Sequence, residues 1–233
     1  MTSMKRFAAG LLLAVALLGG SIASRAQNES ELLAGTTAQW WQYAVSTPAS
    51  VSPFNYTTDN DPKGLGCRVG QHDPIWFLVG AFFGGTANRT CTVPAGEWLF
   101  FPVINNFWTN TADICGQTGN LNVTQERSLI APLIDSATNM SVTVDGKIVP
   151  NLIRNKSVPF ATAMPVDNIF NDPCGGPGTV PARVYSPSVD DGYYVLLKPL
   201  KVGTHTLQIH AESSDGFTVV VNYTLIIAPV HLN

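Results

Sequence analysis

The chain has 233 residues with 13 Lys or Arg and 16 Asp or Glu, so its formal net charge is −3 at pH 7. Charged residues make up only 12% of the sequence, about half the usual share. This acidic, charge-poor composition lacks the basic patches that nucleic acids and anionic membranes attract, so we expect neither as a partner.

Residues 1–26 have the pattern of an export signal. Lys5 and Arg6 precede the apolar run 7–18, which is shorter than the roughly 20 residues that a membrane-spanning helix needs. The tripeptide "SRA" that ends the segment fits the small-x-small cleavage rule. Cleavage there removes three bases and no acids, which leaves a net charge of −6. We expect residues 27–233 to form a single secreted or periplasmic domain without an integral membrane segment.

The first half of the mature chain is predicted to contain one helix and two strands. Thr36 or Thr37 can cap a short helix that Pro48 ends. A loop rich in Pro, Gly, Asn and Asp follows at 50–71. The aromatic and β-branched runs 75–85 and 97–108 predict strands, separated by a turn-rich connection at 86–96. Within the second strand, Pro102 predicts an edge position or a bulge.

The second half continues with one helix and then mainly strands. Asn122 or Thr124 can cap a helix over 122–138, which Pro132 should kink or split. The dipeptide Asp145-Gly146 predicts a tight hairpin turn. Four further runs predict strands, at 178–185, 192–200, 204–212 and 217–229. The fold class we predict is mainly β: an antiparallel two-sheet sandwich, jelly-roll or immunoglobulin-like, with one or two short peripheral helices.

All four cysteines lie in the mature part of the chain. An even number in an oxidising compartment predicts two disulfides, for which three connectivities are possible. We prefer Cys67–Cys91 and Cys115–Cys174, mainly because the first pair closes the shorter loop. The cysteines do not show metal-ligand spacing, so we expect no zinc site. The sequence predicts no cofactor.

The strand at 204–212 carries two histidines and a glutamate. Side chains of a strand alternate between its faces, so His205 shares an apolar face with Leu207 and Ile209, at the rim of the core. His210 and Glu212 point the other way. The two histidines therefore cannot bind one metal together on a regular strand, and a bulge would be needed to bring them together.

Two short acidic clusters offer oxygen ligands of the kind that calcium prefers. They are Asp59, Asn60 and Asp61 in one segment, and Asp190 and Asp191 in the other. Neither has the full pattern of an EF-hand loop. Turns built from Asx side chains are the simpler interpretation of both segments.

The most polar setting of any tryptophan is "NNFWTN", which contains Asn105, Asn106 and Trp108. Sugar-binding modules stack pyranose rings on exposed aromatic rings and orient them with amide side chains. These three residues are therefore candidate ligand-binding residues, and we add His205 as a fourth. The alternative for Trp108 is packing in the core.

Several longer phrases carry a resemblance to a known family. The chain resembles a family of exported bacterial β-sandwich-like proteins with no established biochemical function, over residues 40–228. The phrases are "WWQYA", "GCRVGQ" leading into "IWFLVG", "RTCTVPAGEWLFFPVIN", "DGYYVLLKPL" and "VGTHTLQI". The resemblance implies a secreted sandwich-like domain with a disulfide-framed region, which agrees with the pair Cys67–Cys91. It transfers no catalytic residue.

Three functions follow as hypotheses. The first is an exported, non-catalytic binding or envelope-associated module whose partner is a carbohydrate or another envelope protein. The alternative is a secreted hydrolase that uses carboxylates near His205 or Glu97. The third is a structural or host-surface interaction protein. A cleft with facing carboxylates or a His–carboxylate pair would favour the enzyme, and exposed coplanar tryptophans would favour sugar binding.

Overall fold

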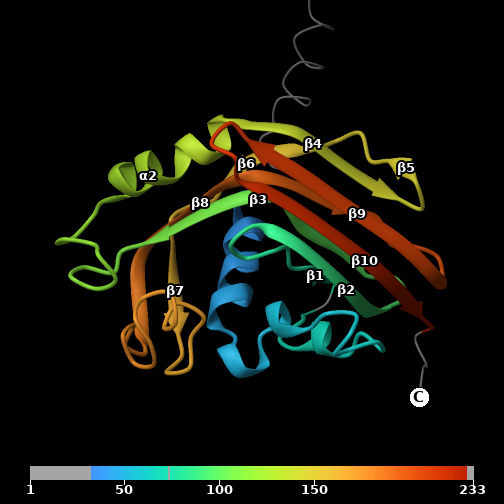
Figure 1. Ribbon diagram of the computed structural model, residues 1–233, viewed down its shortest axis with the longest axis horizontal. Coiled ribbons are helices and arrows are strands. Elements are labelled where there is room, and N and C mark those ends of the chain that lie inside the picture. The colour runs from blue at the N-terminus through green and yellow to red at the C-terminus, as the bar shows by residue number, and fades with distance from the viewer. Residues whose placement is uncertain (1–32, 73, 230–233) are drawn as a thin grey trace, which may run out of the picture.

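The computed structural model describes residues 33–72 and 74–229, in which two five-stranded sheets form the body of the protein (Figure 1). The predicted export segment 1–26 lies outside the described residues. The first sheet has the order β1-β3-β8-β6, with β7 also paired to β8. Its strands are β1 (Ile75–Phe77), β3 (Trp98–Thr109), β6 (Ile153–Lys156), β7 (Phe160–Met164) and β8 (Arg183–Leu197).

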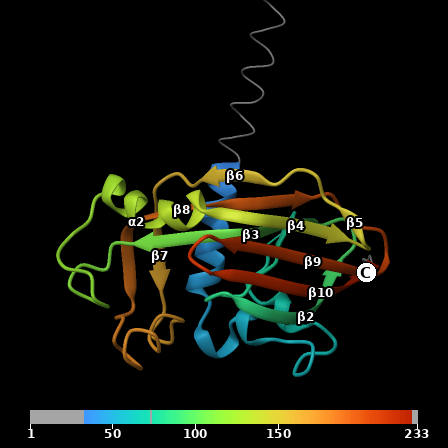
Figure 2. The same cartoon turned by 45° about the horizontal axis from the view of Figure 1, so that its top comes forward.

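The second sheet has the order β2-β10-β9-β4-β5, and Figure 2 shows the first four of these strands side by side. Its strands are β2 (Gly85–Pro94), β4 (Ala137–Val144), β5 (Lys147–Ile148), β9 (Gly203–Ser213) and β10 (Thr218–Ala228). The predicted turn at Asp145-Gly146 joins β4 to β5. The two-sheet, mainly β architecture confirms the predicted fold class.

The main core lies between the two sheets. Every second residue of β10 from Val219 to Ile227 is buried, as the predicted alternation requires. These side chains pack with Leu207 and Ile209 of β9 and with Phe101 of β3. Burial of such aliphatic and aromatic side chains contributes about 1.5–3 kcal/mol each, so this layer dominates the stability of the fold.

A second apolar cluster covers the other face of the first sheet. The helix at residues 33–46, blue in Figure 1, buries Trp40, Trp41 and Val45. These side chains pack with Phe100 of β3 and Tyr194 of β8. The predicted N-terminal helix is present and gives the first sheet a second buried face. The predicted caps are wrong, because Thr36 and Thr37 lie inside the helix, where Thr37 Oγ1 donates to the Ala34 carbonyl.

The second helix, α2 (Val123–Asp135), packs on β3 and β8 through Ile130 and Ile134. Asn122 caps it, as predicted. The Asn122 side chain accepts a hydrogen bond from the Gln125 backbone N–H, and the Gln125 side chain accepts one from the Asn122 backbone N–H. Pro132 lies inside the helix and does not split it.

Two features of the sheets differ from the sequence prediction. Residues 86–96, predicted as a connection, mostly form β2. The run 75–85, predicted as one strand, forms only β1, which ends at Phe77. The sheets are also not purely antiparallel, because β1 pairs parallel with β3 and β2 pairs parallel with β10. Strand β2 was missed because its Thr, Asn and Gly residues resemble a turn. Its burial does not alternate either, since Arg89, Thr90 and Cys91 are buried in succession.

Irregularities and cross-links fix the register of these strands. The predicted bulge in β3 is present, since pairing with β8 shifts between Pro102 and Ile104. The structure contains the two preferred disulfides, Cys67–Cys91 and Cys115–Cys174. The first ties the 3₁₀ helix η3 (Gly66–Arg68) to β2. Within the described residues, no helix has the length and apolar character needed to cross a bilayer.

We expect the double variant Cys67→Ala/Cys91→Ala to lose about 2–4 kcal/mol of unfolding free energy, because the disulfide restricts the unfolded chain. Urea denaturation measures the loss. Non-reducing mass spectrometry of the wild type should show two disulfides. Four free thiols in protein purified from an oxidising compartment would contradict the assignment.

Candidate ligand-binding site

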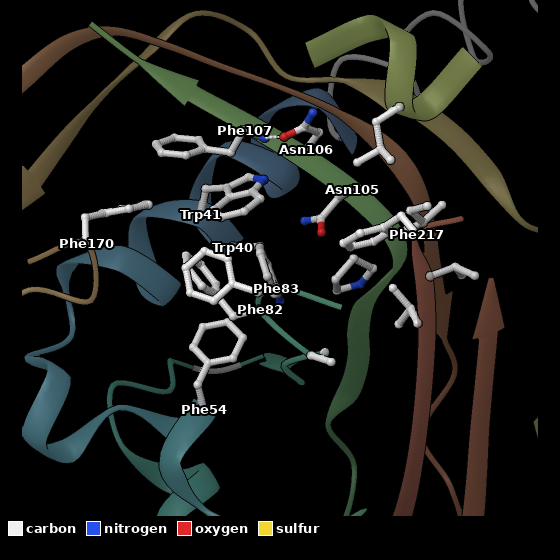
Figure 3. A pocket seen from close by; sticks show the side chains of 17 residues that line it. Trp40, Trp41, Phe54, Phe82, Phe83, Asn105, Asn106, Phe107, Phe170 and Phe217 are labelled. Atoms are coloured by element: carbon white, nitrogen blue, oxygen red, sulfur yellow. Dashed lines mark hydrogen bonds between the residues drawn. The ribbon is translucent and has the colours of Figure 1, made fainter. Parts of the chain in front are cut away.

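A cavity of about 260 Å³ opens beside the N-terminal helix, against β3 and the end of β10 (Figure 3). We call it the aromatic pocket, because eight aromatic rings and two asparagines account for most of its wall. These residues are Trp40, Trp41, Phe54, Phe82, Phe83, Asn105, Asn106, Phe107, Phe170 and Phe217. None of the described residues that line the cavity has a charged side chain.

The rings of the aromatic pocket hold one another in place. Trp41 stacks on Phe107 with ring centroids 4.5 Å apart, and Phe107 stacks in turn with Phe170. Phe82 makes edge contacts with Trp41 and with its neighbour Phe83. Phe83 is 68% exposed, so the pocket has a rigid aromatic wall and one ring that faces solvent.

Two glycines make room for the side chains of this wall. Gly84 has φ +79°, and a Cβ there would lie 2.7 Å from the Phe217 ring. Gly192 pairs with Asn105 across β8 and β3, and a Cβ there would lie 2.6 Å from the Asn105 Cβ. Both positions therefore require glycine, since real Cβ atoms do not approach so closely.

Asp190 is a fully buried acid directly behind the aromatic wall. Its Oδ1 accepts hydrogen bonds from Trp41 Nε1 at 2.6 Å and from the Tyr194 hydroxyl at 2.5 Å. Burial raises the pKa of Asp190 to about 7, against these two hydrogen bonds, which lower it. The carboxyl group thus anchors the N-terminal helix to β8.

The two candidate asparagines lie in the aromatic pocket together. Asn105 Nδ2 donates to the Tyr194 hydroxyl at 3.2 Å, which connects the pocket to Asp190. Asn106 accepts a hydrogen bond from the Phe107 backbone N–H and donates one to the Ile130 carbonyl. The structure thus places both of these candidate residues in one cavity, whose walls and buried acid the sequence did not identify.

Trp108, the third candidate, lies outside the aromatic pocket. Its ring is half-buried, and its Nε1 donates to Gln117 Oε1 at 3.1 Å. It lines a separate crevice beside Cys115 and Cys174. The exposed aromatic ring at the pocket is therefore Phe83 and not Trp108 as predicted. Phe83 lies in the run 75–85, which the sequence predicted to be an apolar strand.

His205, the fourth candidate, is also remote from the aromatic pocket. Its Nδ1 lies 2.7 Å from Asp145 Oδ2, and its Nε2 lies 2.9 Å from the Lys201 carbonyl oxygen. The hydrogen bond to Asp145 is the main reason that the pKa of His205 is raised. Because both ring nitrogens face acceptors, the ring is best satisfied as a cation, with no nitrogen free to accept a proton.

Other acids of the described chain are held by cations or by backbone. Arg154 bonds Asp191 at 2.8 Å and Asp135 at 2.5 Å, on the opposite face of β8 from Asp190. Asp61 accepts from the backbone N–H groups of Leu65 and Gly66. An Asx side chain therefore holds this loop, but it reaches four and five residues ahead rather than the two of an Asx turn. Residues 33–72 and 74–229 contain no cluster of three potential metal ligands.

Asp190 and Asp191 do not form the turn that the sequence favoured. Both lie inside β8, and both are buried. Strand alternation places them on opposite faces of the sheet, one toward Trp41 and the other toward Arg154. That alternation was the signal in the sequence that could have separated them.

Arg89 is a functional residue that the sequence analysis missed. It is buried in β2, and its guanidinium donates to the backbone carbonyls of Pro53, Phe54, Tyr56 and Gly80. Two of these four residues, Phe54 and Gly80, line the aromatic pocket. The cation therefore fixes part of the pocket wall by drawing backbone carbonyl groups of these residues to one guanidinium.

Glu126 is a second buried acid, in the first turn of α2. Among the described residues, neither of its carboxyl oxygens has a hydrogen-bond partner. Burial raises the pKa of Glu126 to about 7, against the lowering effect of Arg127. A buried acid of this kind costs folding free energy whenever it is ionised.

No protein-family model matches the chain, and no curated protein matches it significantly. Its function is therefore inferred from the chemistry of the aromatic pocket.

We expect Arg89→Lys to lower the free energy of unfolding by about 1–3 kcal/mol, because one ammonium group cannot reach all the carbonyls that the guanidinium fork bonds. Urea denaturation measures this loss. Arg183→Lys is the matched control, since Arg183 is exposed, and it should change stability by about 0.5 kcal/mol or less. Equal effects of the two substitutions would contradict the role of Arg89.

We expect Glu126→Gln to stabilise the protein by about 1–3 kcal/mol at pH 8 and by much less at pH 5. Between the ordinary pKa of 4.5 and the raised pKa of about 7, the folded chain binds more protons at Glu126 than the unfolded chain does. Its unfolding free energy therefore falls as the pH rises through this window.

Urea denaturation at both pH values measures the effect of Glu126→Gln. Asp190 is present in both wild type and variant, so its effect on the pH dependence of the unfolding free energy cancels in the difference between them. Glu212→Gln is the control, because hydrogen bonds from Asn139 and His210 lower the pKa of Glu212. That variant should gain no stability at pH 8. A gain from Glu126→Gln that is the same at both pH values would disprove the buried ionisation.

Proposed function

We propose that this protein is an exported, non-catalytic binding module whose aromatic pocket holds one ring of a neutral ligand. A carbohydrate residue is the ligand class that we favour. The observation that carries the proposal is the aromatic pocket itself: a cavity of about 260 Å³ walled by aromatic rings, with two asparagines and no charge.

The wall of the pocket suits a sugar ring. A pyranose presents an apolar C–H face that stacks on aromatic rings, and hydroxyl groups at its edge that bond to amides. The cavity is slightly smaller than the roughly 300–1,000 Å³ usual for small-molecule sites. It therefore suits one ring or the end of a chain better than an extended oligosaccharide. An ionised ligand would lose its hydration without gaining an ion pair.

Export is supported by the two disulfides, which form and persist in oxidising compartments. The predicted signal at 1–26 and the resemblance to exported proteins agree with this location. Both remain predictions of the sequence.

The hydrolase alternative gains little support from the described residues. General acid–base catalysis needs a titratable group within hydrogen-bond reach of the substrate, and none lines the aromatic pocket. Asp190 is shielded behind Trp41, and both nitrogens of His205 are engaged. Glu97 lies in the turn that precedes β3, away from the pocket lining. Binding without catalysis is the simpler role.

The proposal predicts that Phe83→Ala weakens ligand binding by about three- to tenfold, since it removes one stacking surface. Ligand-observed NMR against a panel of mono- and disaccharides finds a ligand, and titration calorimetry measures its affinity. Ile148→Ala is the matched control, because Ile148 is 76% exposed on β5, outside the pocket lining. Folded protein that binds no member of the panel would remove the carbohydrate assignment.

A further inference from the structure

The hydrogen bonds behind the aromatic pocket fix which end of the Asn105 amide faces the cavity. Trp41 Nε1 can only donate, and it donates to Asp190 Oδ1. The Tyr194 hydroxyl oxygen lies 2.5 Å from the same Asp190 Oδ1. The carboxylate accepts, so the hydroxyl must donate its single proton to Asp190.

The Tyr194 oxygen is then left with only its lone pairs for Asn105. It can accept a hydrogen bond but has no second proton to give. The amide group that faces it at 3.2 Å must therefore be the NH₂ group of Asn105, not the carbonyl. This assignment follows from the donors and acceptors in the chain, so it does not depend on telling amide nitrogen from oxygen by shape.

Protonation of Asp190 would leave this direction unchanged. The Thr37 side chain lies close enough to the carboxyl group to lower its pKa. Asp190 Oδ1 already accepts two hydrogen bonds, whereas Oδ2 accepts none of the hydrogen bonds found in the described residues. A proton would therefore bind to Oδ2, and Oδ1 would continue to accept from Tyr194. Asn105 keeps the same orientation in both states of the acid.

The Asn105 carbonyl oxygen is consequently turned toward the open side of the pocket. Figure 3 shows the Asn105 side chain reaching into the space between Trp41 and Phe217, with its nitrogen on the Trp41 side. No other residue of the described chain donates to this oxygen. Both ends of Asn106 are already bonded to backbone groups. Among the side chains that line the pocket, the Asn105 oxygen is thus the acceptor left for a ligand.

We propose that Asn105 makes the pocket selective for ligands that carry a hydroxyl group on the edge of the ring that stacks on the aromatic wall. The proposal rests on the proposed function and adds the hydrogen-bonding direction of the ligand. Tyr194 is a positioning residue, because it fixes the amide without touching the ligand. A ligand that offers only acceptors at this edge places two lone pairs against each other and loses a hydrogen bond.

Two probe pairs test the selectivity, and in each pair methyl groups replace the hydroxyl protons. The saccharide pair is methyl β-glucopyranoside and its tetra-O-methyl derivative. The aromatic pair is phenol and anisole. In whichever pair binds, we expect the hydroxyl form to bind about tenfold more tightly than the methylated form, the value of one hydrogen bond. The pair that binds also shows whether the hydroxyl group belongs to a sugar or to an aromatic alcohol.

Variants of Asn105 and Tyr194 test whether these residues cause the preference for the hydroxyl form. Asn105→Leu should reduce the preference for the hydroxyl form to about one, while stacking still holds the ring. Tyr194→Phe frees the amide to turn, so it should reduce the preference without abolishing binding. Asn222→Leu is the control, because Asn222 bonds Asn88 on the surface of the second sheet, and its preference should equal that of the wild type. If Tyr194→Phe does not fold, Asn105→Leu and Asn105→Ala decide the question.

The outcomes separate the two proposals. If no probe of either pair binds the folded protein, the proposed function fails and the selectivity fails with it. If the rings bind, but hydroxyl and methylated forms bind equally, the pocket stands and the role of Asn105 is wrong. A preference for hydroxyl that survives in Asn105→Leu would also overturn the assignment.

Discussion

The hydrogen bonds to one buried carboxyl oxygen, Asp190 Oδ1, are the constraint on which the candidate site depends. They join Trp41 on the N-terminal helix to Tyr194 on β8, two elements that are far apart in the sequence. The position of Trp41 sets the position of Phe107, which stacks on it. Tyr194 in turn holds Asn105. One acid therefore places both the apolar wall and the polar contact of the pocket.

Such an acid costs folding free energy. The second oxygen of Asp190 accepts none of the hydrogen bonds found in the described chain, and burial raises the pKa of the group to about 7. An amide could accept the same hydrogen bonds without the ionisation. Structures retain buried groups of this kind most often where they position something, since proteins otherwise lose them to selection for stability. Its neighbour Asp191 is buried on the opposite face, where Arg154 forms an ion pair with it.

The sequence predicted the local features of the fold well and the non-local ones poorly. The cap at Asn122, the turn at Asp145 and the buried face of β10 all depend on residues within a few positions of one another. Strand β2 was missed because its partner, β10, lies more than 120 residues later in the chain. A polar strand with a distant parallel partner and no alternating apolar residues has no local signature.

The candidate site shows the same limit. Asn105 and Asn106 stood out because two amides beside aromatic residues are visible in a short phrase, and they do line the pocket. Trp108 stood out for the same reason, yet its indole N–H is occupied by Gln117. Arg89 gave no signal, because a cation whose partners are all backbone carbonyls leaves no trace in the types of the residues around it.

The walls of the aromatic pocket come from segments spread over most of the described chain, and a separate device holds each one. Asp190 holds Trp41, Arg89 holds the carbonyl groups beside Phe54, and Gly84 lets its loop approach Phe217. Such an arrangement, with a separate buried interaction for each wall, keeps the pocket formed in the absence of a ligand. It is expected of a site whose affinity depends on being formed before the ligand arrives, because a pre-organised wall does not have to lose conformational freedom when it binds.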